Sequence, residues 1–274
     1  MKTSFKNKVV LITGGASGIG RIMGRKALER GAARLVIWDI NEQNMNDTLS
    51  AFASFGDRVV AILCDVSDLE SMEKAKSETV ERAGYPDIII NNAGIVVGKY
   101  FHEHSMQAIS RTMRINADAP MLLTRLFLSE MMQRNRGAIC NIASSAGLVS
   151  NPKMSVYAAS KWAVVGWSDS LRLEMEALNK DIAITTIMPY YIKTGMFDGV
   201  RSKVIPLMEP EVAAERIVCA IERRKKMYAL PFPYWFIRLA QGIFPLRLYD
   251  WLMRTVLGIY DTMNEFKGRT NTAL

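Results

Sequence analysis

The sequence predicts an α/β fold in which helices cover both faces of a doubly wound parallel sheet. Short β-branched runs alternate with longer helical stretches through the first two-thirds of the chain, and the first run ends in glycines. The chain has 274 residues, of which 49% are hydrophobic and 23% charged, so it can bury a large core and is not a disordered chain. We find no repeat, low-complexity tract or linker, which favours one domain.

Each expected element has its own signal. The strands are β-branched or apolar runs at Lys8–Thr13, Arg34–Trp38, Arg58–Leu63, Asp87–Ile90, Gly137–Ile142 and Ile182–Ile187. Helices are expected at Ile19–Arg30, Asn41–Phe55, Ser67–Ala83 and Glu211–Lys226, before each of the last two strands, and from Tyr157 onward. Ser67 with Glu70 three residues later is a candidate N-terminal cap.

The chain divides into a catalytic part, residues 1–226, and an extension of the same domain, residues 227–274. A loop at about 190–210, with Gly, Pro and small polar residues from Gly195 to Pro210, is expected to form a substrate lid. The extension is dense in Trp, Phe, Leu and Tyr, with interspersed arginines. It is either an amphipathic lid that lies on a membrane or a helix pair packed on the core or a second subunit.

Composition excludes several classes of protein. The three cysteines are an odd number and widely spaced, and no Cys/His cluster exists, so neither a disulfide framework nor a metal site is expected. Although the net charge is +8, no basic stripe with interleaved aromatics indicates nucleic-acid binding. No export signal or spanning helix is recognised, so we expect a cytoplasmic protein, not a secreted one. The basic, apolar extension either makes peripheral contact with a membrane or packs on protein.

A glycine-rich loop follows the first strand and opens the first helix. Its sequence is TGGASGIG, which includes Gly14, Ser17, Gly18, Ile19 and Gly20. Glycines allow a pyrophosphate to approach the backbone, and the helix N-terminus offers free N–H groups. Asp39 ends the second strand about 20 residues later, where a carboxylate binds the ribose hydroxyls and repels a ribose phosphate. The pattern predicts a dinucleotide site with NAD(H) favoured over NADP.

A second set of residues indicates acid–base chemistry. Tyr157 and Lys161 are four residues apart and share one face of a helix, so the ammonium is expected to lower the pKa of the phenol. Ser144 lies 13 residues before Tyr157, after a strand, where its hydroxyl can hold a substrate oxygen. Asn116 is expected in the middle of a helix, where it either bonds a backbone carbonyl or orders a proton-relay water.

These motifs, in this order and spacing, resemble the short-chain dehydrogenase/reductase family with the smaller core. The resemblance runs from about Lys8 to Thr194 and implies a Rossmann-like fold. It also implies a catalytic tetrad of Asn116, Ser144, Tyr157 and Lys161. The cofactor-binding residues that it implies beyond the loop and Asp39 are Asp65, Val66, Asn92, Ala93, Gly94, Tyr157, Lys161, Pro189, Ile192 and Thr194.

One position departs from the family pattern. The family has Pro-Gly after the sixth strand, whereas this chain has Pro189-Tyr190. Because tyrosine takes left-handed backbone angles only at a cost, the loop is expected to differ. Tyr190 or Tyr191 is then a candidate contact for the substrate.

The stretch from Leu35 to Asn41 and the ending from Tyr260 to Arg269 resemble a lipid-handling branch that includes retinol and hydroxysteroid dehydrogenases. This resemblance implies a lipophilic alcohol substrate (a retinoid, hydroxysteroid or long-chain alcohol), NAD as hydride acceptor, and a homodimer or homotetramer. Two alternatives are a cytoplasmic biosynthetic ketone reductase on a more polar substrate and a non-catalytic NAD-binding sensor or scaffold.

Overall fold

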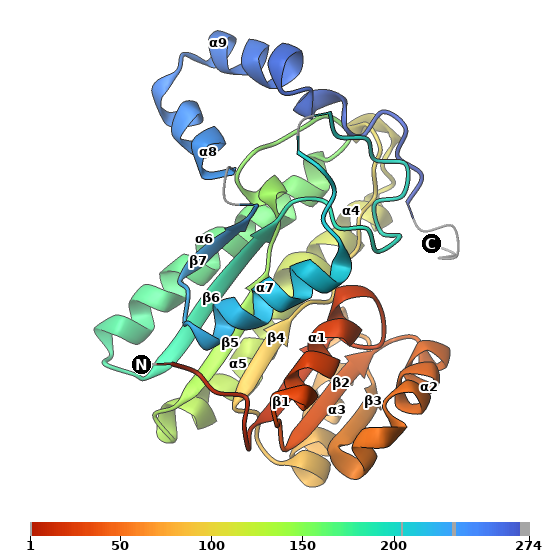
Figure 1. Cartoon of the computed structure of the whole chain (residues 1–274), viewed down its shortest axis with the longest axis vertical. Coiled ribbons are helices and arrows are strands. Elements are labelled where there is room, and N and C mark those ends of the chain that lie inside the picture. The colour runs from red at the N-terminus through yellow and green to blue at the C-terminus, as the bar shows by residue number, and fades with distance from the viewer. Residues whose placement is uncertain (1, 204, 232–233, 269–274) are drawn as a thin grey trace.

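The computed structural model describes residues 2–203, 205–231 and 234–268, and its centre is a seven-stranded parallel sheet (Figure 1). The strand order is β3-β2-β1-β4-β5-β6-β7, so the order reverses between β1 and β4. A ligand site is expected at this reversal, beyond the carboxyl ends of the strands. The strands are β1 (Val9–Thr13), β2 (Arg34–Asp39), β3 (Val59–Leu63), β4 (Ile88–Asn91), β5 (Gly137–Ile142), β6 (Ile182–Pro189) and β7 (Met227–Leu230).

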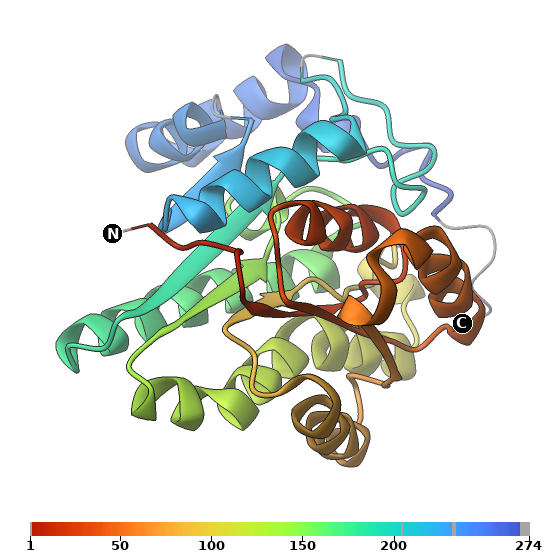
Figure 2. The ribbon, with the colours of Figure 1, turned by 60° about the horizontal axis from the view of Figure 1, so that its bottom comes forward.

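Helices cover both faces of the sheet, as the sequence predicts (Figure 2). On one face, α1 (Gly18–Glu29), α2 (Glu42–Ala51) and α7 (Pro210–Glu222) share a core with alternate strand residues such as Val10 and Ile12. On the other, α3 (Leu69–Ala83), α5 (Ala119–Gln133) and α6 (Ser155–Ala177) pack against the intervening residues, such as Leu11. A short helix, α4 (Met106–Met113), contacts α6. The predicted fold class is confirmed.

One local prediction is wrong, and one strand is absent from the sequence predictions. Asp68, not Ser67, caps α3, because its carboxylate accepts hydrogen bonds from the backbone N–H groups of Glu70 and Ser71. The Ser67 hydroxyl instead donates to Asp65 at 2.7 Å. Residues Met227–Leu230, which the sequence places in the extension, form β7 beside β6. This edge strand has only four residues, too few to show a periodic pattern.

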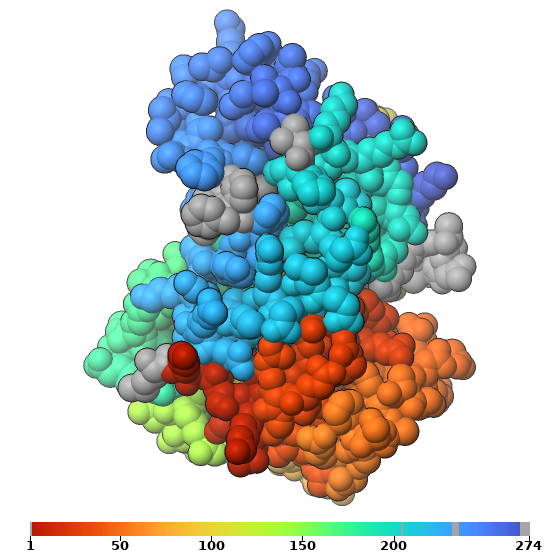
Figure 3. All heavy atoms as spheres, in the orientation of Figure 1, coloured from red at the N-terminus to blue at the C-terminus, as the bar shows by residue number. Residues whose placement is uncertain are grey.

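The rest of the extension forms α8 (Tyr234–Ile243) and α9 (Leu246–Trp251), which stand at one end of the molecule (Figures 1 and 3). Their inner side chains, Ile237 and Tyr249, are buried in one apolar cluster with Tyr190 and Tyr191. The extension therefore packs against the loop that follows β6, where the predicted substrate contacts lie.

Candidate functional site

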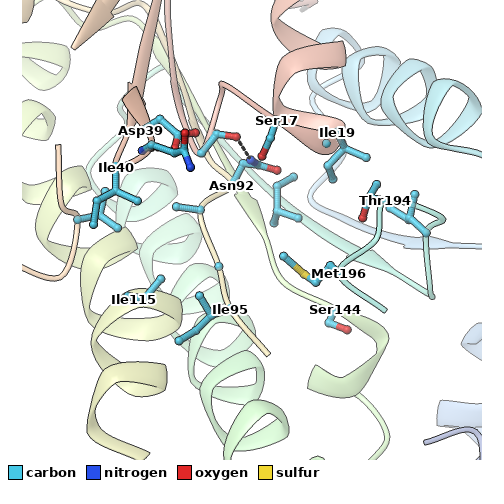
Figure 4. Close-up of a pocket in the computed structure, with 18 of the residues that line it drawn as sticks. Ser17, Ile19, Asp39, Ile40, Asn92, Ile95, Ile115, Ser144, Thr194 and Met196 are labelled. Carbon is cyan, nitrogen blue, oxygen red and sulfur yellow. Dashed lines mark hydrogen bonds between the residues drawn. The ribbon is translucent and has the colours of Figure 1, made fainter. Parts of the chain in front are cut away.

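One large cavity lies at the carboxyl ends of the strands and has a volume of about 270 Å³ (Figure 4). Its lining includes every predicted catalytic or cofactor-binding residue except Gly20 and Asn116. Of the two candidate substrate contacts, Tyr190 lines this main cavity, whereas Tyr191 lines a small cavity on the other side of Ser144. The structure thus brings the two predicted groups, one for phosphate and one for acid–base chemistry, to a single space.

The glycine-rich loop forms the upper edge of the main cavity in Figure 4. Gly14 and Gly18 have left-handed φ angles of 61° and 54°. A Cβ on Gly20 would lie 2.2 Å from the Gly14 carbonyl oxygen, so the turn needs glycine there. The Ser17 side chain caps none of the N–H groups at the start of α1. These N–H groups and the positive end of the helix dipole suit a bound pyrophosphate.

Asn92 and Thr13 hold this loop against β4. The Asn92 amide nitrogen donates to the carbonyl oxygens of Thr13 and Gly14, at 2.9 and 3.1 Å. The Thr13 hydroxyl accepts from the backbone N–H groups of Asn92 and Ala93. The neighbouring Asn91 is buried and donates to the Asn141 side chain at 2.7 Å. Asn92 therefore fixes the cavity edge, and Asn91 joins β4 to β5.

Asp39 lies at the end of β2, where the sequence predicts the ribose contact. Its carboxylate accepts hydrogen bonds from the backbone N–H groups of Ala16 and Asn41, at 3.0 and 3.1 Å. These bonds fix the carboxylate beside the cavity and leave lone pairs for further donors. Asp65 and Val66 lie on the same side of the cavity, and Asp65 accepts two hydrogen bonds from Ser67. The Asp39 carboxylate can therefore accept hydrogen bonds from two neighbouring hydroxyl groups of a ligand.

Ser144, Tyr157 and Lys161 meet at the other end of the cavity. Ser144 follows β5, and its side chain accepts a hydrogen bond from the backbone N–H of Ala146. Tyr157 and Lys161 lie on one face of α6, with the ammonium 5.7 Å from the centre of the phenol ring. All three side chains are buried. The Lys161 ammonium also donates to the Ile142 carbonyl oxygen at 2.9 Å, which fixes its position.

Burial dominates the electrostatics of this group, contrary to one prediction. It raises the pKa of the Tyr157 hydroxyl above its ordinary value, and the Ser144 hydroxyl opposes the change. It lowers the pKa of the Lys161 ammonium from 10.5 to about 8. The expectation that Lys161 would lower the Tyr157 pKa is therefore wrong for the structure as described. Desolvation disfavours the charged form of both groups.

Asn116 lies outside the main cavity, in a π-helical turn at Arg114–Asp118 between α4 and α5. Its side chain exchanges two hydrogen bonds with the backbone of Ile95, at 2.8 and 2.9 Å. The amide also donates to the Ser160 hydroxyl at 3.1 Å. Of the two readings left open by the sequence, the structure shows the bond to a backbone carbonyl. Asn116 therefore joins a cavity wall to α6.

The loop after β6 carries Tyr190 at the position where the family has glycine. Tyr190 is not among the residues with a left-handed φ angle, and its N–H donates to Leu230 at 2.7 Å. Its ring lies 4.6 Å from that of Tyr191, which contacts Phe197 at 5.0 Å. Phe197 in turn meets the Tyr157 ring at 6.1 Å. Tyrosine is thus accommodated in ordinary backbone geometry by aromatic packing next to the candidate catalytic phenol.

Several lining residues are absent from the sequence predictions. Met196 and Phe197 come from the predicted lid, and Arg111 and Ile115 come from the region of α4 and its π-helical turn. Ile95 follows the Asn-Asn-Ala-Gly motif directly. Of these residues, only Ile95 could have been predicted from the sequence, by its position next to that motif. The other residues reach the cavity through contacts between distant segments of the chain. Met196, Phe197, Ile115 and Ile95 add apolar side chains to the lining, and Arg111 adds a cation.

Comparison with known proteins agrees with this geometry. A family model described as short chain dehydrogenase matches residues 8–204. Mouse epidermal retinol dehydrogenase 2 is 33% identical over 96% of this chain and 86% of its own length. Estradiol 17-beta-dehydrogenase 11 from Pongo abelii is 30% identical over 96% of this chain and 87% of its own. A short-chain dehydrogenase/reductase from Burkholderia phymatum, solved in complex with NAD, has a TM-score of 0.79 and 25% identity, covering 88% of this chain and 95% of that one.

The chain belongs to the short-chain dehydrogenase/reductase family, and its relatives include retinol and estradiol dehydrogenases. It is an oxidoreductase of that family.

Proposed function

We propose that the protein interconverts a lipophilic alcohol and its carbonyl compound with NAD(H). The observation that carries this proposal is the shared cavity, which has a pyrophosphate cradle at one end and Ser144, Tyr157 and Lys161 at the other. Hydride transfer needs both parts within reach of one substrate carbon. The class of substrate is argued separately, from the lining and from the relatives.

The residues present fit a dinucleotide. The glycine cradle beside the uncapped N-terminus of α1 suits the pyrophosphate, and Asp39 suits the adenosine ribose. The carboxylate accepts hydrogen bonds from two hydroxyls but repels a phosphate at the same place, which supports NAD over NADP. Ile192 and Thr194, after β6, lie at the end of the cavity where a nicotinamide would be held. When bound, the nicotinamide ring accepts or supplies the hydride.

The chain's own residues handle the oxygen and its proton. The Ser144 hydroxyl lies beside Tyr157 and holds the reacting oxygen of the substrate in line with the phenol. In carbonyl reduction, Tyr157 donates a proton to that oxygen; in alcohol oxidation, it accepts one. Lys161 is charged at neutral pH, because its pKa is about 8, and its ammonium lies 5.7 Å from the centre of the Tyr157 ring. Asn116 is a positioning residue, since it bonds to Ile95 and Ser160 and not to the cavity.

The lining supports an apolar substrate. Ile95, Met196 and Phe197 surround the space next to Ser144, and the small cavity on its other side is lined by residues such as Val149, Met154 and Tyr191. An apolar lining with a few convergent polar groups is typical of sites for small lipophilic ligands. The relatives named as retinol and estradiol dehydrogenases agree with this class of substrate.

The test is NADH formation by purified protein with NAD and a panel of alcohols. The panel contains retinol, several hydroxysteroids, a long-chain secondary alcohol and a short polar alcohol. We expect turnover of the apolar members, loss of turnover in Tyr157→Phe, and unchanged NADH binding in that variant. Turnover of the polar alcohol alone would favour a biosynthetic ketone reductase instead. If no alcohol is oxidised with NAD and no ketone is reduced with NADH, although NADH still binds, the enzyme assignment is contradicted.

A further inference from the structure

The α8–α9 tip, which we define as residues Leu239–Val256, carries a dense set of exposed apolar side chains. Within it, residues 241–248 are all exposed, including the turn between the two helices. Ile243 and Leu246 are 65% and 72% exposed, so most of each side chain is in contact with solvent. Such a patch marks an interaction surface rather than ordinary surface variation. Its large members are Leu239, Ile243, Phe244, Leu246, Leu248, Trp251 and Val256.

The tip has two distinct faces. Leu239 and Ile243 are one turn apart on α8 and point outward, whereas Ile237 is buried on the opposite side. Tyr249 and Met253 are likewise buried against the cluster that contains Tyr191. The inner face thus fixes α8 and α9 to the domain, and the outer face is apolar without being part of the core.

The charged residues of the tip indicate which kind of partner its outer face binds. The tip contains two arginines, Arg247 and Arg254, and one acid. The acid, Asp250, accepts a hydrogen bond from the Tyr260 hydroxyl at 2.6 Å. Arg247 and Arg254 are exposed beside the apolar side chains. A twofold contact between copies would bring these cations together, because such an interface pairs the same patch with itself. An anionic surface is the complementary partner.

We infer that the α8–α9 tip docks on an anionic lipid surface. Among the described residues, no helix is long and apolar enough to cross a membrane. An amphipathic segment with Trp, Phe and Leu on one face and arginines nearby is the type that lies in the interface plane. The tip also projects from one end of the molecule, where a flat bilayer can reach it (Figure 3). Docking by this surface is independent of the proposed reaction.

Docking would bring the lipid next to the candidate substrate region. Ile259, which follows α9 and its π-helical turn, lines the small cavity beside Ser144 together with Tyr191. This cavity holds only about 10 Å³, so a substrate that enters here must displace the segment that carries Ile259. The same segment is continuous with the docked helices. A lipophilic substrate would thus reach the site from the bilayer without crossing water.

The experiment measures binding of the full chain to vesicles, without alcohol or cofactor. One set of vesicles is phosphatidylcholine, and the other contains phosphatidylserine as well. The tip variant is Ile243→Glu/Leu246→Glu. The matched control is Leu173→Glu/Leu178→Glu, which changes two leucines that are 52% and 55% exposed at the far end of α6. A charge variant, Arg247→Gln/Arg254→Gln, tests the electrostatic part.

We expect binding to the anionic vesicles that weakens with salt, is lost in the tip variant and is retained in the control. The charge variant should bind about fivefold more weakly for each arginine removed. Absence of wild-type binding, equal binding by tip and control variants, or equal, salt-independent binding to both vesicles would each overturn the proposal. So would a wild-type oligomer that the tip variant dissociates, with no vesicle binding. NADH binding and thermal unfolding verify the fold of each variant, and the milder Leu246→Gln replaces any variant that fails to fold. Because no turnover is measured, failure here leaves the proposed reaction untouched.

Discussion

Replacing Lys161 with methionine should change how protein stability depends on pH. The ammonium is buried, and burial lowers its pKa from 10.5 to about 8. At neutral pH the folded protein therefore carries a buried charge that the unfolded chain would hydrate. Methionine has a similar length and no charge, so Lys161→Met removes this cost along with the hydrogen bond to Ile142.

The magnitude follows from the pKa difference. A difference of one in pKa corresponds to about 1.4 kcal/mol, so the fall from 10.5 to about 8 destabilises the folded state by about 3 kcal/mol at neutral pH. Between these two pKa values the unfolded chain binds more protons than the folded protein. Stability from this group consequently rises with pH, and by about pH 9.5 roughly 2 kcal/mol of the cost has gone. Below about pH 7 the cost is constant.

The assay is urea unfolding of the wild type and Lys161→Met at about pH 7 and about pH 9.5. Other groups titrate over this range, including the buried thiols, but they are shared by both proteins and cancel in the difference. The wild type should gain about 2 kcal/mol relative to the variant between the two pH values. A difference that stays constant within about 0.5 kcal/mol would show that Lys161 is not desolvated in the folded protein.

Three other predictions test the cavity and the core. Gly20→Ala should lower the free energy of unfolding by about 2 kcal/mol and abolish NADH binding, because its Cβ would lie 2.2 Å from the Gly14 carbonyl oxygen. The control is Gly166→Ala, since Gly166 lies on α6 with open space around it. This control should be neutral or slightly stabilising in thermal unfolding. Asp39→Ala should lower the ratio of kcat/KM for NAD over NADP at least about tenfold, and an unchanged ratio would contradict the ribose contact. Trp38→Phe should cost about 2 kcal/mol, since the buried indole N–H donates to Thr79 at 2.9 Å. A double-mutant cycle with Thr79→Val should give about 1 kcal/mol of coupling, and strict additivity would rule out that hydrogen bond as a stabilising contact.

Much of the site could be predicted from sequence because its parts are local. A glycine turn between a strand and a helix, and a tyrosine and a lysine four residues apart, fix their geometry within a few residues. Because all strands of the sheet are parallel, their carboxyl ends lie at one edge, and this brings Ser144 and the glycine loop together. The expected order of strands and helices is therefore sufficient to place these groups together.

The predictions that failed depend on surroundings that the sequence does not display. Burial raises the pKa of Tyr157, and this burial, to which Phe197 of the lid contributes, is not visible in the spacing from Lys161. The strand β7 is visible only through its pairing with β6.

The sequence by itself determined the α/β fold, the family and the residues of the phosphate loop and the acid–base group, because each is encoded by short-range pattern. Tertiary structure alone decided which side of the extension is buried, what lines the space beside Ser144, and how Lys161 and Tyr157 are charged. The physical reason is that burial, and the desolvation that follows from it, is a property of segments brought together from distant parts of the chain.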